Sequence, residues 1–203
     1  MYDRARVAVI YHGTHGSVLR LACAVTAGAW DAGAEVRLRR VGALAPVRGI
    51  GRGARRASDE VTIAAADDLA WADVAIFGVP ARDGGIAAPL ADFIASAGVL
   101  SAAGRLAGKL YAAFGDATAG HGAPDGALRS LVDVFVRWGG LLVPPGSTEP
   151  TRFRVHLPHE PAAATRARAS SRAHLRAAYS LGGRAAKTVR ALKAGRRRPT
   201  EAA

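Results

Sequence analysis

The sequence is short of cysteine, of long apolar runs and, towards its C-terminus, of acidic residues. A single cysteine, Cys23, excludes a disulfide framework within the chain. No apolar run is long enough to cross a membrane, and the first residues carry no signal-peptide pattern, so we expect a soluble, cytoplasmic protein. Cys23 falls within a helical pattern, where we expect it to be a small buried residue rather than a nucleophile.

Acidic residues are almost missing from the last quarter of the chain. Residues 1–151 are close to neutral, whereas residues 152–203 hold 13 Lys and Arg against 2 Asp and Glu, which accounts for nearly all of the net charge of +12. This pattern predicts a neutral body with a basic appendage. One interpretation is a nucleic-acid or acidic-partner binder, with weak polyanion contact. The other, which we favour because few aromatic residues are available for base stacking, is a docked helix with a solvated outer face.

Several catalytic motifs are absent as well. There is no GxSxG elbow, no cluster with metal-ligand spacing, and His156 and His159 lie in a proline-containing linker, so a hydrolase or a metal enzyme is not indicated. No lysine follows the first glycines as in an ATPase P-loop, and the third glycine of the dinucleotide-binding GxGxxG motif is missing.

The stretch around which the chain is organised is Arg6 to Val25, which reads as strand, glycine-bearing turn and helix. Residues 7–11 form an apolar run typical of a central parallel strand, the turn follows at 12–17, and apolar residues recur at helical spacing from Val18. Such a turn directs backbone amides and the positive end of a helix dipole at one point. The sequence therefore predicts a phosphate-binding loop, with an ordinary ligand-free turn as the alternative.

Strand and helix patterns alternate along the rest of the chain. We expect strands at 35–41, 73–78, 109–114 and 141–144, and helices at 64–72, 89–99, 125–138 and 162–194. The first of these strands alternates apolar and charged residues, which places it near a sheet edge. We expect one domain over residues 1–194, a long Gly/Arg loop at 42–60 and a disordered basic tail at 195–203. The fold class is α/β, a doubly wound five-stranded parallel sheet.

Ligands bind such sheets beyond the carboxyl ends of the strands, where the strand order reverses. For the order 2-1-3-4-5, the loops 12–17, 79–86 and 115–123 meet there. All three are rich in glycine and small residues, and their convergence predicts a ligand crevice.

Four segments carry a family resemblance: VAVIYHGTHGSV at 7–18, ADVAIFGVPARDGG at 72–85, GRLAGKLYAAF at 104–114 and RWGGLLVPPG at 137–146. Through them the chain resembles the WrbA-type NAD(P)H:quinone oxidoreductases, which have a flavodoxin-like fold. The resemblance implies an FMN-dependent oxidoreductase that takes hydride from NAD(P)H and passes it to a quinone or a similar planar acceptor, assembled as a homodimer or homotetramer.

The resemblance also implies a set of site residues. The FMN phosphate would be held by Gly13, Thr14, His15, Gly16, Ser17 and Val18. The isoalloxazine ring would be lined by Pro80, Ala81, Arg82, Asp83 and Gly84, with Arg82 as the catalytic charge-stabilising residue. The other edge of the ring and the ribityl chain would be followed by Asp116, Ala117, Thr118, Ala119 and Gly120.

The chain departs from the family pattern at several of these positions. Gly13 stands where a serine is usual, Asp83 where an aromatic residue is usual, and Trp138 in a region that commonly carries a histidine. The alternative function is therefore a flavodoxin-like domain that has lost FMN and acts as a binding or scaffold protein.

Overall fold

The computed structural model describes residues 4–13, 16–42, 61–80, 85–116, 125–144 and 167–196. The elements in chain order are β1 (Arg6–Tyr11), α1 (Gly16–Asp31), β2 (Glu35–Arg40), α3 (Ala66–Trp71), β3 (Val74–Pro80), α4 (Ala88–Ser96), α5 (Gly98–Ala102), β4 (Leu110–Asp116), α6 (Asp125–Arg137), β5 (Leu141–Leu142) and α7 (Ala167–Arg196). No helix in these ranges is long and apolar enough to cross a membrane.

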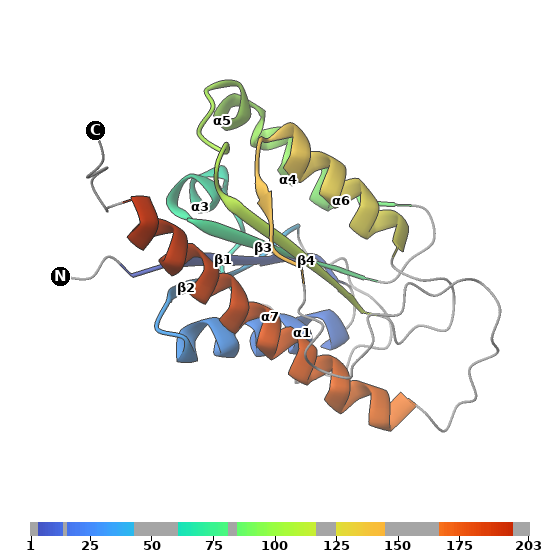
Figure 1. The fold of residues 1–203 in the computed structure, drawn as a ribbon. Helices are drawn as coiled ribbons and strands as arrows, with labels where there is room; N and C mark the ends of the chain where they lie inside the picture. Colours follow the sequence, from blue (N-terminus) through green and yellow to red (C-terminus); the bar gives the residue numbers. More distant parts are fainter. Residues whose placement is uncertain are drawn as a thin grey trace.

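The five strands form one parallel sheet in the order β2-β1-β3-β4-β5, as expected for a doubly wound fold (Figure 1). β1 and β3 are buried along nearly their whole length, whereas β2 is partly exposed at the edge. This contrast confirms the sequence interpretation, because a continuous apolar run suits a strand covered on both faces and an alternating one suits an edge.

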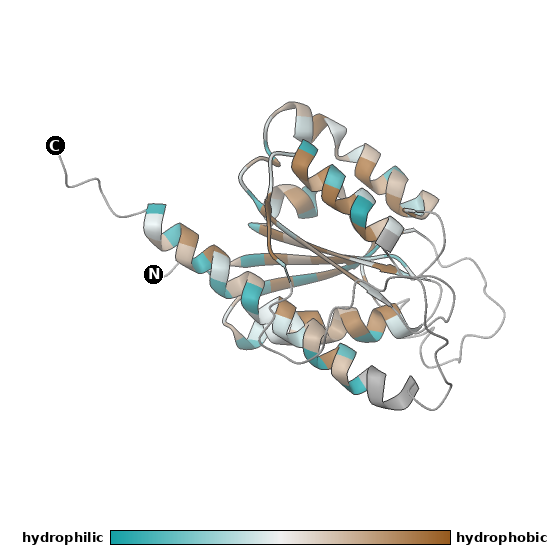
Figure 2. Cartoon of the chain, turned by 45° about the vertical axis from the view of Figure 1, so that its right-hand side comes forward, coloured by the Kyte–Doolittle hydropathy of each residue, from teal (hydrophilic) through white to brown (hydrophobic). Residues whose placement is uncertain are grey.

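Helices cover both faces of the sheet. One face packs on α1 and α7 through alternate residues of β1, including Val7, Val9 and Tyr11. The other face packs on α3, α4 and α6, with Phe77, Tyr111, Phe135 and Trp138 forming an aromatic cluster. Figures 1 and 2 show the sheet with helices on both of its faces. Trp138 therefore belongs to the core.

Two helices begin or end at other residues than the sequence predicts. The pattern at 89–99 is divided into α4 and α5 by a break at Ala97, and α5 extends to Ala102. α7 includes Gly195 and Arg196, which the sequence interpretation had assigned to a disordered tail. The rest of that tail, residues 162–166 of the expected helix and residues 43–60 of the expected long loop lie outside the described residues.

Some predicted burials are wrong. Cys23 is exposed, because it lies on the side of α1 that faces away from the buried stripe of Val18, Ala22 and Val25. On α6, the apolar pattern of the sequence groups Val132 and Val136 with Leu131 and Phe135 on one side. Val132 and Val136 are nevertheless 38% and 62% exposed, and the core-facing side runs through Leu131, Val134 and Phe135.

Asp68 is the one buried charged residue in the described part of the chain, with 5% exposure. Its carboxylate accepts hydrogen bonds from Arg39 Nε at 3.0 and 3.1 Å, Arg37 Nη1 at 3.3 Å and the Ala65 amide at 3.1 Å. The Arg37 guanidinium also lies 4.0 Å from the centre of the Trp71 ring. The helix dipole favours an acid in the first turn of α3, but the larger effect of Asp68 is to join α3 to the edge strand β2.

α7 packs against α1 at very short range, through glycines. A Cβ atom on Gly182 would lie 2.0 Å from the Val25 carbonyl oxygen, and one on Gly28 would lie 1.9 Å from the Tyr179 carbonyl oxygen. The same face of α7 buries Ala178, Leu181, Ala185 and Val189. This packing confirms that the basic C-terminal helix is docked on the domain by its apolar stripe.

Candidate cofactor site

The carboxyl ends of β1, β3 and β4 lie next to one another at one edge of the sheet. The His12 amide, just past β1, donates to the Gly78 carbonyl at 2.9 Å. β3 and β4 each end two residues later than predicted, so Pro80 and Asp116 end their strands and are register partners. Two of the predicted site residues, from the second and third loops, are thereby brought side by side.

The second and third loops also converge at their far ends. A Cβ atom on Gly126, in the first turn of α6, would lie 3.6 Å from the Gly85 amide nitrogen. The two segments therefore lie close together at both ends: Pro80 is next to Asp116 where they begin, and Gly85 is near Gly126 where they end. This geometry agrees with the predicted crevice at the point where the strand order reverses.

The first loop leads directly into α1. The helix begins at Gly16, two residues earlier than expected, so Gly16 and Ser17 belong to its first turn. The first amides of a helix have no partner within the helix, and they carry partial positive charge. The first turn of α1 contains no acidic residue, so nothing in that turn opposes the binding of an anion.

Gly13 is a position at which a side chain would be crowded. A Cβ atom there would lie 3.0 Å from Val18 Cβ and 3.2 Å from Val18 Cγ2. The Val18 side chain is 1% exposed and belongs to the core. Both residues are among the six predicted to hold the phosphate. Gly13 leaves room beside the helix, and Val18 can offer only its backbone amide.

Near the carboxyl ends of the strands, the backbone of Gly78 lies very close to the Phe114 ring. A Cβ atom on Gly78 would lie 2.4 Å from Phe114 Cζ and 3.0 Å from Tyr11 Cβ. The absence of a side chain at Gly78 lets the Phe114 ring lie across β3, with Tyr11 on the neighbouring strand. Both aromatic side chains are almost fully buried, so they belong to the core next to this edge of the sheet.

His12 is a residue at this edge that the predicted site did not include. Its half-buried ring lies with Nδ1 3.1 Å from the Val41 carbonyl oxygen, and the Val41 amide donates to the Tyr11 carbonyl at 2.8 Å. His12 therefore ties the end of β2 to the beginning of the first loop. The sequence feature that could have indicated a role for His12 is its position directly after the first buried strand.

The remaining predicted site residues are not placed by the structure. Thr14, His15, the range 81–84 and the range 117–120 lie outside the described residues, as does the side chain of Asp116. Among the residues that are described, no group of three His, Cys, Asp or Glu side chains could hold a metal ion.

A five-stranded parallel sheet in the order β2-β1-β3-β4-β5, with helices on both faces, is the flavodoxin-like fold. The solved structures that it resembles include the WrbA-like flavodoxin from Agrobacterium tumefaciens, with a TM-score of 0.61 and 22% identity over 92% of this chain and 98% of that one. An archaeal flavodoxin matches with a TM-score of 0.56 and 17% identity, over 91% of this chain and 98% of that one. These likenesses confirm the fold.

The family model described as NADPH-dependent FMN reductase matches residues 5–149. Curated relatives named NAD(P)H dehydrogenase (quinone) include one from Caulobacter vibrioides, 34% identical over 140 residues, 68% of this chain and 70% of that protein. Another, from Deinococcus radiodurans, is 32% identical over 154 residues, 73% of this chain and 77% of that protein. The chain belongs to the NADPH-dependent FMN reductase family, and its activity class is that of an FMN-dependent NAD(P)H oxidoreductase.

Proposed function

We propose that this protein transfers hydride from NAD(P)H to a quinone or a similar planar acceptor, with FMN held at the carboxyl edge of the sheet. The observation that supports the proposal most strongly is the acid-free N-terminus of α1, which opens beside Gly13 at the strand-order reversal. Bound FMN supplies the redox chemistry, and the protein supplies binding, orientation and electrostatics.

Each of the three loops has a distinct part in this proposal. The amides of residues 13–18 bind the phosphate, residues 80–84 line the flavin ring, and residues 116–120 follow its other edge. In the second loop, the Arg82 guanidinium stabilises negative charge beside the ring or binds the phosphate groups of the nicotinamide donor. The adjacency of Pro80 and Asp116 supports this division, because it brings the beginnings of the second and third loops together.

Steady-state oxidation of NADPH and of NADH, in the presence of FMN and 1,4-benzoquinone, tests whether a quinone is the electron acceptor. We expect quinone-dependent oxidation with a saturable dependence on quinone, and we expect Arg82→Ala to lower kcat/KM by roughly tenfold or more. Arg137→Ala, which removes an equal charge from the exposed end of α6, is the matched control. An FMN-loaded protein that oxidises NAD(P)H no faster with quinone than without it would overturn the assignment of the acceptor.

We propose, as a second role, weak association of the outer face of α7 with polyanions. The described helix has no acidic residue from Ala167 to Arg196. Its exposed basic residues include Arg172, Arg176, Arg184, Lys187 and Arg190. They lie opposite the buried stripe, along a helix about 45 Å long.

Retention on immobilised heparin tests this second role. Replacing Arg172, Arg176 and Arg184 with glutamine is expected to move elution to a clearly lower salt concentration, because fewer counterions are exchanged. The control replaces Arg20, Arg129 and Arg137, which are exposed on other helices, and changes the net charge by the same amount. Equal shifts for both triple variants would mean that net charge alone determines retention, and would contradict a binding face on α7.

A further inference from the structure

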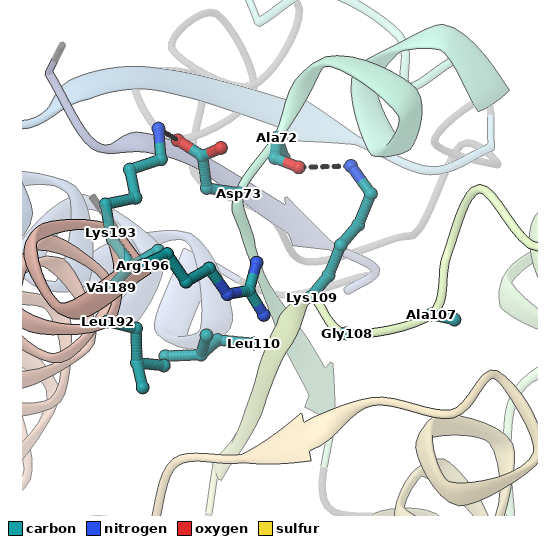
Figure 3. A pocket seen from close by; sticks show the side chains of 10 residues that line it. All are labelled: Ala72, Asp73, Ala107, Gly108, Lys109, Leu110, Val189, Leu192, Lys193 and Arg196. Atoms are coloured by element: carbon teal, nitrogen blue, oxygen red, sulfur yellow. Dashed lines mark hydrogen bonds and ion pairs between the residues drawn. The ribbon is translucent and has the colours of Figure 1, made fainter. Parts of the chain in front are cut away.

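A small cavity lies at the amino edge of the sheet, at the opposite end of the strands from the cofactor site. Its volume is about 130 Å³, and it is bounded by the beginnings of β3 and β4 and by the last turns of α7. Its polar residues are Asp73, Lys109, Lys193 and Arg196, and small or apolar residues form the remaining wall (Figure 3). Neither the family's activity nor the proposed site uses this end of the molecule.

Positive charge is in excess around this cavity. Asp73 Oδ2 accepts hydrogen bonds from the Arg6 backbone amide at 2.8 Å and from Lys193 Nζ at 2.5 Å. The charges that act on Lys109 are those of Asp73, Arg105, Arg6 and Lys193. The cavity wall itself holds one carboxylate, that of Asp73, and three cationic side chains, those of Lys109, Lys193 and Arg196. Desolvation, and after it the neighbouring cations, lowers the pKa of Lys109 against the opposing effect of Asp73.

Lys109 has an identifiable structural role. Its ammonium group donates to the Ala70 carbonyl at 3.0 Å and to the Ala72 carbonyl. Figure 3 shows this side chain running from the beginning of β4 towards Ala72. Two of its three donors are therefore used in joining β4 to the segment between α3 and β3, and it contributes charge to the cavity more than it contributes free donors.

Arg196 is differently placed. Figure 3 shows its guanidinium reaching from the last turn of α7 towards the beginning of β4, between Lys193 and Leu110. It passes close to Gly108, where a Cβ atom would lie 3.7 Å from Arg196 Nη2. Within the described part of the chain the Arg196 side chain makes no hydrogen bond or ion pair. A guanidinium has five donors in a planar fork that matches two oxygens of a carboxylate or a phosphate.

We propose that this cavity binds an oxyanion of phosphate size, held by the Arg196 fork in the positive field of the Lys109 and Lys193 ammonium groups, both of which keep their protein partners. The volume limits the ligand, because pockets that enclose a drug-sized or nucleotide-sized molecule measure roughly 300 Å³ or more. The ligand is therefore free inorganic phosphate, or the terminal phosphate of a small ester whose remainder stays outside the cavity. Binding would join the end of α7 to the beginnings of β3 and β4.

The test is calorimetric titration with inorganic phosphate at constant ionic strength, on protein saturated with FMN so that the phosphate position at α1 is occupied. We expect saturable binding, which Arg196→Gln weakens by roughly tenfold or more, as for the loss of a charge-assisted hydrogen-bonded pair. Arg129→Gln is the matched control, because it removes the same charge from an exposed position on α6, away from this cavity and from α7. We expect it to leave the affinity unchanged.

A titration with glycerol 3-phosphate separates the two sources of the ligand. Binding as tight as that of inorganic phosphate identifies a terminal phosphate as a ligand, and binding only of inorganic phosphate identifies the free anion; both results depend on Arg196 if the proposal is correct. Equal weakening by Arg196→Gln and Arg129→Gln would show a general charge effect and overturn the proposal. An absence of saturable binding to the unmodified protein would overturn it as well.

Discussion

Replacing Gly182 with alanine is expected to lower the free energy of unfolding by about 3 kcal/mol or more, or to prevent folding. The new Cβ atom would lie 2.0 Å from the Val25 carbonyl oxygen and 3.0 Å from the Ala29 amide nitrogen. Both are backbone atoms of α1, so the clash is relieved only by moving the two helices apart. That movement would unpack the buried stripe of α7, and overpacking of this kind costs more than the small gain in helix propensity from glycine to alanine.

Two other glycines of the same helix give a graded control. A Cβ atom on Gly195 would meet nothing within 4 Å, and one on Gly183 would lie 3.2 Å from the Gly28 carbonyl oxygen. Chemical denaturation should therefore rank the alanine variants with Gly195→Ala neutral or slightly stabilising, Gly183→Ala intermediate and Gly182→Ala lowest. If Gly182→Ala unfolds at the same denaturant concentration as Gly195→Ala, α1 and α7 are not packed through glycine as described.

Replacing Ser17 with aspartate is expected to weaken FMN binding by roughly a hundredfold without destabilising the fold. The residue lies in the first turn of α1, where an acid interacts favourably with the helix dipole, by about 0.3 to 1 kcal/mol. A phosphate dianion at the same helix end would meet a like charge a few ångströms away, at a cost of about 3 kcal/mol. Stability and affinity should therefore change in opposite directions, which a merely unfolded variant cannot imitate.

Two comparisons isolate the charge in this experiment. Ser17→Asn keeps a polar side chain of similar size and is expected to bind FMN within a few fold of the unmodified protein. Riboflavin, which lacks the phosphate, should bind the Ser17→Asp variant and the unmodified protein with similar affinity, measured by quenching of flavin fluorescence. Equal FMN affinities for the Asp and Asn variants would place the phosphate somewhere other than the N-terminus of α1.

Much of the fold could be predicted from the sequence, because local pattern and tertiary environment agree. The run Val7 to Tyr11 is apolar throughout and is buried on both sides, and β2 alternates and lies at the edge. The helical spacing of Val18, Leu21 and Val25 likewise describes the buried side of α1. In these elements the hydrophobic period alone determines which side chains face the sheet.

The errors arise where residue type and position disagree. Cys23 is a small apolar residue on an exposed side of α1, and Val132 and Val136 are apolar residues away from the core-facing side of α6. Asp68 shows the reverse: an acid becomes buried because two arginines from β2, far away in sequence, hydrogen-bond to it. Long-range partners of this kind leave no local pattern.

The site was predictable to a similar degree. The position of the loops follows from the parallel topology, and the glycine at position 13 follows the first buried strand in the sequence itself. The lengths of β3 and β4 were underestimated, so Pro80 and Asp116 were expected in loops rather than as paired strand ends. The contacts of His12 with β2, and the glycine contact between α1 and α7, depend on pairs of distant elements and could not be derived from spacing.

We expect this family member to hold FMN at the N-terminus of α1. The most direct test is the visible absorption spectrum of the purified protein, followed by titration with FMN. We expect either flavin absorption bands in the protein as purified or saturable binding of FMN with a dissociation constant in the micromolar range or below. A colourless protein that does not bind added FMN would contradict it, and would indicate a flavodoxin-like domain that has lost its cofactor.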